Sequence, residues 1–395
     1  MSGRSFSAPS LACDLVAVTP EERAEPTGAT TGATAGATTG ATAGATYAGA
    51  GVDLSAGDEA VARIREAVAS TARREVLGGI GGFAGLFALD HDRFPHPVLV
   101  SSTDGVGTKM LIAQATGRFE TIGVDLVAMC VDDVVCAGAE PLFLLDYVAV
   151  GKLVPERVES IVGGIAEGCR IAGCALVGGE TAEHPGAMGP DDVDLAGFAV
   201  GVVEAGRELG PHRVVTGDVL VGLPSPGLRS NGYTLARHVL LERAGLSLDG
   251  PAWEGASRSL ADVLLEPSVV YAPAVLAALA AARTAVHACA HVTGGGIPGN
   301  LRRVLPPDAD AVLDPSTWDV PRVFTEIARL GHVSDDEMTR VFNLGLGMVL
   351  VVAPAAVEAV VRAVGAATAS SAADRGGSPA AVVGEVVAGS GAVRL

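Results

Sequence analysis

Ser102-Thr103-Asp104-Gly105-Val106-Gly107-Thr108-Lys109 directly follows an apolar segment, residues 97–101, that is predicted to be a buried strand. The two glycines let backbone N–H groups approach a ligand closely, and successive N–H groups form a cradle for an anion. With the Asp104 carboxylate on magnesium and the Lys109 ammonium on phosphate, the segment predicts a nucleotide-phosphate site.

The same residues also suit a plain strand-to-helix turn in which Asp104 caps the helix, and the segment alone does not decide between the two. It is not a Walker A loop, because G-x-x-x-x-G-K-[ST] occurs nowhere in the chain. Lysine usage favours function. The 27 basic residues include only two lysines, Lys109 and Lys152, and a retained lysine indicates that a compact ammonium is needed.

The composition of the 395-residue chain predicts a packed, cytoplasmic protein. Hydrophobic residues make up 49% and charged residues 18%, so a globular body is expected. The net charge of −18 argues against a nucleic-acid or anionic-membrane partner. The six cysteines form no C-x-x-C pair and are interpreted as reduced thiols, and no apolar run reaches the length of a membrane span.

The chain divides into three predicted parts. Residues 1–46 contain a repeated TGAT or AGAT unit and are predicted to be a disordered extension; residues 47–211 and 212–395 are predicted to be domains. Strands alternate with helices, but some strands follow one another directly, which predicts α/β or mixed α+β architecture. The predicted helices are 58–70, 122–137, 155–173, 233–244, 273–283 and about 300–305, and the predicted strands are 97–101, 142–150, 175–177, 196–203 and 219–222.

The predicted helix 122–137 is apolar on nearly every side and should be buried. A buried carboxylate costs several kcal/mol unless it is paired or metal-bound. Asp125 can cap this helix, whereas Asp132 and Asp133 lie in its middle, where one of the two can face solvent. Asp125 and Asp133 are eight residues apart, roughly 12 Å along the axis, so they cannot both bind one ion directly.

Four further glycine-rich segments are candidates for ligand binding. Residues 78–83 resemble a dinucleotide fingerprint in a poor context and fit a phosphate-covering loop better. Residues 177–183 place Gly179, Glu180 and Thr181 after a short strand, where a tight turn with a capping box is the structural alternative. Ser230, Asn231 and Tyr233 open a helix whose free N–H groups can hold an anion. His291 precedes Thr293 and three glycines; a lone histidine is more often a core residue, but the glycines favour function.

Together these segments resemble the phosphoribosylformylglycinamidine cyclo-ligase family, also called aminoimidazole ribonucleotide synthetase, from about Tyr47 to Leu395. Asp132 stands where the family usually has Asn, which puts in doubt a role that needs an amide there, and residues 1–46 have no counterpart. The matching segments are Ala50-Gly51-Val52-Asp53, GGIGGF (78–83), TDGVGTK (103–109), GVDLVAMCVDD (123–133), AGAEPLFLLDY (137–147), Gly151-Lys152-Leu153, VGGETAEHPG (177–186), SNGYTL (230–235), HVTGGG (291–296) and Phe342-Asn343.

The resemblance implies that ATP and formylglycinamidine ribonucleotide give ADP, phosphate and aminoimidazole ribonucleotide, a step of de novo purine synthesis. It implies a two-domain fold in which the N-terminal sheets of a homodimer join into a barrel and the C-terminal domain is an α/β layer structure. It implies Mg²⁺ and leaves a requirement for K⁺ open. The protein is expected to position its substrates and stabilise phosphoryl charge rather than supply a nucleophile.

The resemblance also implies roles for the residues singled out above. Asp104 and Asp133 are the expected magnesium ligands, and His291 is expected to contact phosphate or transfer a proton. Asp104, Lys109 and His291 are the candidate catalytic residues. The candidate residues for binding ATP or the second substrate are Gly79, Gly81, Gly82, Asp104, Gly105, Gly107, Thr108, Lys109, Asp125, Gly179, Glu180, Thr181, Ser230, Asn231, Tyr233, Thr293 and Gly294.

Three other functions compete with this one. Another ATP-using enzyme of the same fold is possible in principle, either a selenophosphate synthetase or a thiamine-monophosphate kinase. A selenophosphate synthetase is expected to carry a reactive Cys beside a Lys in its N-terminal glycine-rich loop, and residues 47–85 contain neither. A hydride-transfer enzyme would bind a dinucleotide at residues 78–83 and would not bind ATP. A non-catalytic relative conflicts with the complete set of acids and glycines.

Overall fold

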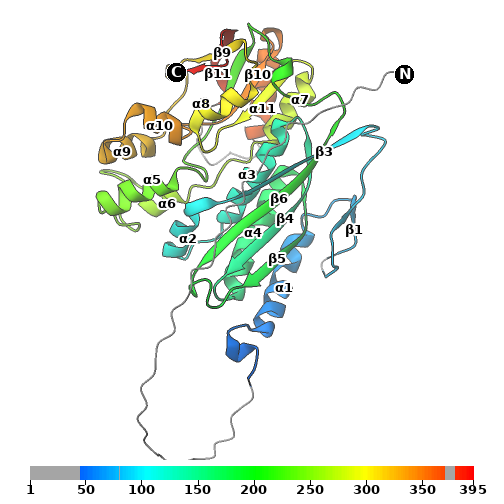
Figure 1. Ribbon diagram of the computed structural model, residues 1–395, viewed down its shortest axis with the longest axis vertical. Helices are drawn as coiled ribbons and strands as arrows, with labels where there is room; N and C mark the ends of the chain where they lie inside the picture. The colour runs from blue at the N-terminus through cyan, green and yellow to red at the C-terminus, as the bar shows by residue number, and fades with distance from the viewer. Residues whose placement is uncertain (1–44, 80, 370–378) are drawn as a thin grey trace, which may run out of the picture. The chain divides into compact units, whose positions relative to one another are not determined.

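The computed structural model describes residues 45–79, 81–369 and 379–395, so nearly all of the predicted extension, residues 1–46, lies outside the described residues. From Ala45 to Leu395 the chain forms one unit with two large sheets, which Figure 1 shows one above the other. Helices pack against both sheets, so the predicted mixed α/β fold class is confirmed.

The first sheet has four strands with helices on one face only. Its neighbouring strands are antiparallel except β4 and β5, which run parallel and are joined through a helix, as parallel strands require. That helix, α4 (Pro155–Ala172), begins with a proline in its first turn and ends at Gly173, whose φ of 72° suits glycine. In spatial order the strands are β3 (Pro97–Gly105), β6 (Val193–Glu204), β4 (Glu140–Val150) and β5 (Ala175–Glu183).

The helix α3 (Ile122–Cys136) is buried along almost its whole length, as its sequence predicts. It packs on α4 and on β3 and β6 of the first sheet, and it also contacts β8 (Val286–His291) and α7 (Ala272–Ala282) of the second half. Because α3 lies between the two sheets, it has no solvent-facing stripe, and one continuous hydrophobic core extends from the first sheet into the second half.

The strand β3 is not buried, so the prediction of a buried strand at 97–101 is wrong. It is the edge strand of its sheet, and the face of the sheet opposite α3 and α4 has no helical cover (Figure 1). That open face carries Leu99, which is 64% exposed, and Phe198 and Tyr147, which are each 40% exposed. Apolar sequence alone cannot distinguish a core strand from an edge strand with an apolar open face.

The strand β5 does not end at Val177, as predicted, but continues through the glycines to Glu183. The tight turn with a capping box, which was the structural alternative for residues 177–183, is therefore not formed. The glycines serve close packing instead, since a Cβ on Gly179 would lie 1.6 Å from Oδ1 of Asp146 on the neighbouring strand β4. A side chain at this position would displace the Asp146 carboxyl group.

The second sheet has six strands, and α7 and α11 (Val357–Ala369) pack together beside it. The predicted helix 233–244 is α5 (Tyr233–Arg237), which continues as a π-helix to Arg243. The helix predicted near 300–305 starts earlier, as α8 (Gly296–Leu301). The strands in order are β12 (Val393–Arg394), β9 (Ala309–Leu313), β11 (Ala381–Ala388), β7 (Val219–Pro224), β10 (Leu346–Val352) and β8.

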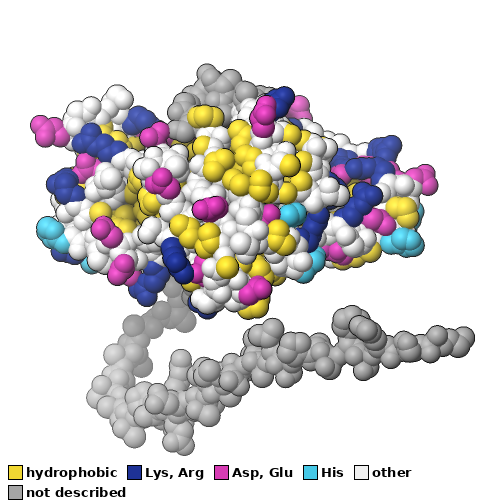
Figure 2. Space-filling view, turned by 90° about the horizontal axis from the view of Figure 1, so that it is seen from above, with side chains coloured by type: hydrophobic (Ala, Val, Ile, Leu, Met, Phe, Trp, Pro, Cys, Tyr) yellow, Lys and Arg dark blue, Asp and Glu magenta, His cyan; other side chains and the backbone are white. Residues whose placement is uncertain are grey.

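The remaining elements surround these two sheets. A two-stranded hairpin, β1 (Val76–Leu77) and β2 (Leu86–Phe87), carries glycines 78, 79, 81 and 82 in its loop. Acidic and basic side chains are interspersed around hydrophobic ones on the face shown in Figure 2, so no continuous basic surface forms there. Among the described residues, no helix has both the length and the apolarity needed to cross a membrane. The other helices are α1 (Leu54–Ala69), α2 (Met110–Thr116), α6 (Leu260–Leu264), α9 (Arg322–Gly331) and α10 (Asp335–Val341).

Candidate active site

Two carboxylates meet at the end of β3. Asp104 is exposed, and among the described residues its carboxylate accepts a hydrogen bond only from its neighbour, Gly105 N–H, at 2.8 Å. Asp133 on α3 accepts hydrogen bonds from His291 Nδ1 at 2.9 Å and from Ser102 Oγ at 3.2 Å. Partial burial raises the pKa of Asp104, and the nearby negative charge of Asp133 raises it further. Asp104 forms no ion pair among the described residues. The two neighbouring carboxylates therefore favour binding of a cation between them.

The charge state of Asp133 is set differently. Burial by itself would raise its pKa, but hydrogen bonds from His291 and Ser102 outweigh burial and leave the pKa below its ordinary value. Asp133 is therefore ionised at neutral pH, and its side chain keeps 42% of its surface exposed. A charged, hydrogen-bonded and still accessible carboxylate suits metal binding.

Loops from both halves of the chain surround this acidic pair. Thr108 Oγ1 lies 3.2 Å from Thr234 Oγ1, and Asn231 Oδ1 accepts a hydrogen bond from Gly294 N–H at 3.0 Å. The turn at Gly107 has a φ of 54° and lies against the backbone of Ser230. Within the part of the chain that the structure describes, the Ser230 hydroxyl is buried and has no hydrogen-bond partner. The structure thus brings together the predicted segments around residues 104–108, 230–231 and 293–294.

Three predicted binding residues lie in the interior behind this site. Lys109 is fully buried, with its ammonium 2.6 Å from Asp125 Oδ2 and 2.7 Å from the Glu266 carbonyl oxygen. Asp125 is also fully buried and accepts hydrogen bonds from Ser268, and it does not cap α3, which was the structural alternative for this residue. Tyr233 is buried and donates its hydroxyl hydrogen to a backbone carbonyl. Burial lowers the pKa of Lys109, although Asp125 opposes that shift. These side chains face one another instead of the open site, because a buried ammonium needs a carboxylate partner.

The two mid-helix acids behave differently from each other, as the sequence predicts. Asp132 is fully buried and accepts a hydrogen bond from Arg229 Nη2 at 2.9 Å, whereas Asp133 reaches the open site. His291 is buried between them: its Nδ1 contacts Asp133 and its Nε2 lies 2.8 Å from Arg229 Nη2. The structure therefore supplies partners for both acids.

A second group of predicted residues lines a cleft of about 280 Å³ between α1 and β5. Glycines 79, 81 and 82 are not among its lining residues; they are exposed in the β1–β2 loop. Burial raises the pKa of Asp146, on the wall of this cleft, to about 7. The residues that line the cleft are Gly57, Ala60, Val61, Ile64, Val68, Asp146, Leu153, Val158, Val162, Leu176, Gly178, Gly179, Glu180 and Thr181.

The cleft and the acidic pair lie on the same sheet but some distance apart. Asp104 pairs with Gly197, Gly197 with Asp146, and Asp146 with Gly179, so these four residues form one row across the strands. Three strand spacings separate Asp104 from Gly179, which amounts to about 14 Å. Within one chain the two groups of residues cannot bind the same small ion.

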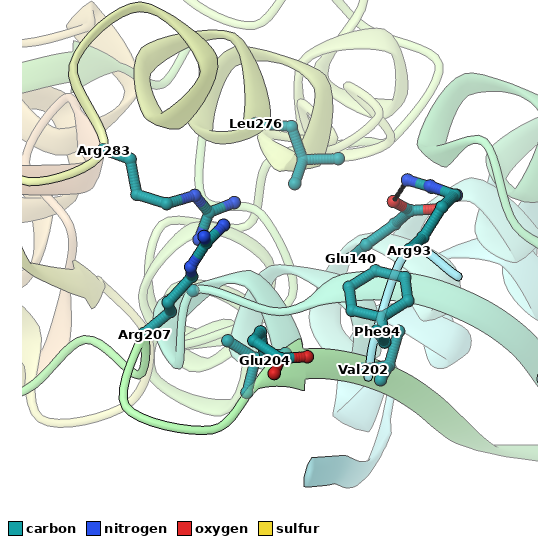
Figure 3. A pocket seen from close by; sticks show the side chains of 10 residues that line it. Arg93, Phe94, Glu140, Val202, Glu204, Arg207, Leu276 and Arg283 are labelled. Atoms are coloured by element: carbon teal, nitrogen blue, oxygen red, sulfur yellow. Dashed lines mark hydrogen bonds and ion pairs between the residues drawn. The ribbon is translucent and has the colours of Figure 1, made fainter. Parts of the chain in front are cut away.

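Another cavity, of about 200 Å³, lies at the opposite end of β3 and β6. Its walls carry Arg207 and Arg283, whose guanidinium groups lie close together, and the ion pair of Arg93 with Glu140 (Figure 3). Asp104 lies seven residue steps along β3 from Pro97, at this end, which corresponds to about 23 Å. This cavity is not part of the candidate active site.

The acidic pair fits a magnesium ion that is shared with a ligand. The described residues contain no group of three or more His, Cys, Asp or Glu side chains placed to hold a metal. Mg²⁺ commonly takes only one or two carboxylates and completes its octahedron with water and substrate phosphates. Asp104 and Asp133 meet that requirement beside the N–H groups of residues 105–108.

Two contributing residues were not singled out from the sequence. Arg229 directly precedes the Ser230-Asn231 motif, but its left-handed backbone and its contact with Asp132 cannot be read from the sequence. Asp146 offered a usable signal, since it is a single acid inside the apolar strand β4. An isolated charge in a buried strand indicates a perturbed carboxyl group.

Models of two protein domains match this chain along most of its described length. The AIR synthase related protein N-terminal domain matches residues 88–203, and the AIR synthase related protein C-terminal domain matches residues 215–395. The chain therefore falls in the AIR synthase related class of two-domain proteins.

Curated relatives narrow this class. The chain is 53% identical over 344 residues to the phosphoribosylformylglycinamidine cyclo-ligase of Anaeromyxobacter dehalogenans, with 86% of this chain and 99% of the relative covered. The corresponding enzyme of Geobacillus kaustophilus is 47% identical, with 87% and 96% covered. This chain belongs to the phosphoribosylformylglycinamidine cyclo-ligase family.

Solved structures agree on the fold at much lower identity. The thiamine-monophosphate kinase of Stenotrophomonas maltophilia is 20% identical and superposes with a TM-score of 0.57, covering 85% of this chain and 95% of its own. A hydrogenase maturation protein HypE in complex with ATP is 19% identical with a TM-score of 0.56, covering 83% and 86%. At these identities the likeness concerns the fold alone.

Proposed function

We propose that this chain uses ATP to close the imidazole ring of aminoimidazole ribonucleotide from formylglycinamidine ribonucleotide, releasing ADP and phosphate in de novo purine synthesis. The observation that carries the proposal is the 53% identity with a cyclo-ligase along 99% of that relative's length. The acidic pair Asp104 and Asp133, beside a backbone N–H cradle, is the chemical feature that supports it. We place the enzyme in the cytoplasm.

In the proposed reaction, the formyl amide oxygen takes the terminal phosphoryl group of ATP, and ADP leaves. An amidine nitrogen then attacks the activated carbon, the carbon–oxygen bond breaks, and phosphate departs with that oxygen. Asp104 and Asp133 would hold the magnesium ion, which offsets phosphate charge when bound. Gly105, Gly107 and Thr108 would orient the phosphate chain with their backbone N–H groups.

The loops across the site would hold the second substrate. Ser230, with its unpaired buried hydroxyl, and the Asn231–Gly294 contact supply donors and acceptors there. Gly179, Glu180 and Thr181, with the cleft below α1, would bind a part of the ligands away from the acidic pair. We assign Lys109, Asp125 and Tyr233 to the support of the site, because they pair in the interior.

We also propose that two copies of the chain pair through the open face of the first sheet and form a barrel. Exposed Leu99, Phe198 and Tyr147 on a face without helices support this, since sheets bury apolar faces against another layer. We propose residues 47–211 and 212–395 as the two domains of each copy.

The route of the formyl oxygen tests the proposal. Substrate labelled with ¹⁸O in the formyl group should deliver its label to inorganic phosphate, with one ADP formed for each imidazole ring. A phosphorylated product that keeps the label would instead indicate a kinase, like the thiamine-monophosphate kinase that shares the fold. Label in released water, with no ADP, would contradict ATP-driven ring closure.

A further inference from the structure

Arg229 holds an unusual backbone conformation next to the candidate active site. Its φ is 63°, in the left-handed region that side chains other than glycine, Asn and Asp rarely adopt. Its side chain is almost entirely buried. A strained residue persists only where its surroundings hold it in place, and such residues cluster at functional sites. The contacts that hold Arg229 in this conformation therefore point to a functional role.

The guanidinium of Arg229 connects both mid-helix acids of α3. Nη2 carries two hydrogens; one points to Asp132 Oδ2 at 2.9 Å, and the other to His291 Nε2 at 2.8 Å. Nη1 donates to the Val269 carbonyl oxygen at 2.8 Å. Asp132 is itself fixed by backbone N–H donors at 2.8 Å from Tyr271 and 3.1 Å from Ala272. The position of the guanidinium is thus set from several sides.

This arrangement fixes the tautomer of His291. A guanidinium has donors and no acceptor, so the nitrogen facing it must accept the hydrogen bond. His291 Nε2 is consequently without hydrogen, and the single ring hydrogen is on Nδ1. From Nδ1 it is donated to Asp133 Oδ1, 2.9 Å away. The imidazole is thus oriented so that Nδ1 holds this carboxylate.

Both ring nitrogens of His291 are therefore occupied. The side chain exposes only 2% of its surface, so no free nitrogen faces the site. Contact with phosphate or proton transfer, the roles expected from the sequence, would require breaking the bond to Arg229 or the bond to Asp133. The accessible group at the end of this series of contacts is Asp133. Its second oxygen accepts a hydrogen bond from Ser102 at 3.2 Å and from no other residue in the described ranges.

We propose that Arg229 and His291 are positioning residues for Asp133. Asp132 anchors Arg229, Arg229 sets the tautomer and orientation of His291, and His291 holds the Asp133 carboxylate so that its remaining lone pairs face Asp104 and a divalent cation. This inference rests on the proposed metal role of Asp133. Partners that orient a metal-binding carboxylate typically change metal affinity about 10–100-fold when mutated.

Two amide substitutions separate positioning from simple packing. The amide nitrogen of Asn occupies the place of Nδ1, so His291→Asn can still donate to Asp133. The amide of Gln reaches the place of Nε2, so His291→Gln keeps the contact with Arg229 and loses the one with Asp133. With ATP present, Mn²⁺ affinity measured by electron paramagnetic resonance should fall about 10–100-fold in His291→Gln and less than about tenfold in His291→Asn. Equal losses, or no loss in either variant, would overturn the proposal.

The unsubstituted protein provides a second test that needs no variant, ligand or turnover. In histidine labelled with ¹⁵N, two-bond ¹H–¹⁵N spectra distinguish protonated from unprotonated ring nitrogens. We expect hydrogen on Nδ1 of His291 and none on Nε2; hydrogen on Nε2 would overturn the inference. A protein that binds Mn²⁺ with ATP and shows this tautomer, but makes no imidazole product, would contradict the proposed reaction and leave the positioning role intact. Absence of Mn²⁺ binding would overturn the positioning role together with the metal role.

Discussion

Lys109 Nζ lies 2.6 Å from Asp125 Oδ2, and neither side chain reaches solvent. This ion pair joins the first turn after β3 to the start of α3, behind the loop that carries Asp104. One of the two lysines in the chain thus has a structural partner, although its motif suggested contact with phosphate.

Removal of the Lys109 ammonium alone should destabilise the fold. Lys109→Met leaves Asp125 buried without its counter-charge, which typically costs about 3–5 kcal/mol. The double variant Lys109→Met/Asp125→Leu should regain most of that loss, because an apolar pair can replace a buried ion pair. Chemical denaturation of the two variants measures both effects. A stable double variant whose KM for ATP rises more than about tenfold would show that Lys109 contacts phosphate after all.

Asp104→Asn should abolish magnesium-dependent turnover and leave the fold intact. The variant removes one of the two charges between which the cation would bind. Because Asp104 is exposed, the substitution changes the packing of the protein little. Asp249→Asn, at an exposed residue far along the chain, is the matched control and should keep its activity. Steady-state rates across a Mg²⁺ titration are the measurement. Near-normal activity of Asp104→Asn would exclude the proposed metal role.

The stability of the protein should depend on pH through Asp146. Burial raises the pKa of this carboxyl group from 3.8 to about 7. Below pH 3.8 the carboxyl group is protonated in both the folded and the unfolded protein. Between the two values the folded state binds a proton that the unfolded state has released, so stability falls as pH rises through this window. Above about pH 7 the cost of burying the charge is fully present.

Asp146→Asn removes this cost. We expect it to stabilise the ligand-free protein by about 1–3 kcal/mol at pH 8 and by clearly less at pH 5. Thermal unfolding at the two pH values measures the difference, with Asp249→Asn as the matched control. An equal gain at both pH values would mean that burial does not perturb this carboxyl group.

A charge on the open face of the first sheet should separate the proposed dimer. Phe198→Asp places a carboxylate where the two sheets would meet, and burying it unpaired there costs several kcal/mol. Val215→Asp, at another exposed apolar residue outside this sheet, is the control. Sedimentation analysis should find dimers of the control and monomers of Phe198→Asp. Equal masses of both variants would contradict pairing through this face.

The sequence predicted those features that depend on local patterns. The continuous apolar character of α3 indicated a buried helix, and Asp132 and Asp133 in its middle were interpreted as a pair of which one can face solvent. The segments around Asp104 and Asn231 were singled out because glycine-rich turns after strands present backbone N–H groups. The structure brings these two segments together, through Thr108 with Thr234 and Gly107 with Ser230.

Features that depend on distant contacts could not be predicted. Lys109 pairs with a residue 16 positions away, and the partners of His291 are 62 and 158 positions away. Packing of the two sheets decides which of these distant side chains come into contact. The exposure of β3 follows from its edge position. The left-handed backbone of Arg229 has no signal in its own residue type.

The dependence of ADP release on formylglycinamidine ribonucleotide tests the central claim most directly. The protein is incubated with ATP and Mg²⁺, with and without this substrate, and ADP is measured. We predict ADP release only when the substrate is present, in step with formation of aminoimidazole ribonucleotide. ADP release at the same rate in its absence, or no release in its presence, would contradict ATP-dependent ring closure at the site of Asp104 and Asp133.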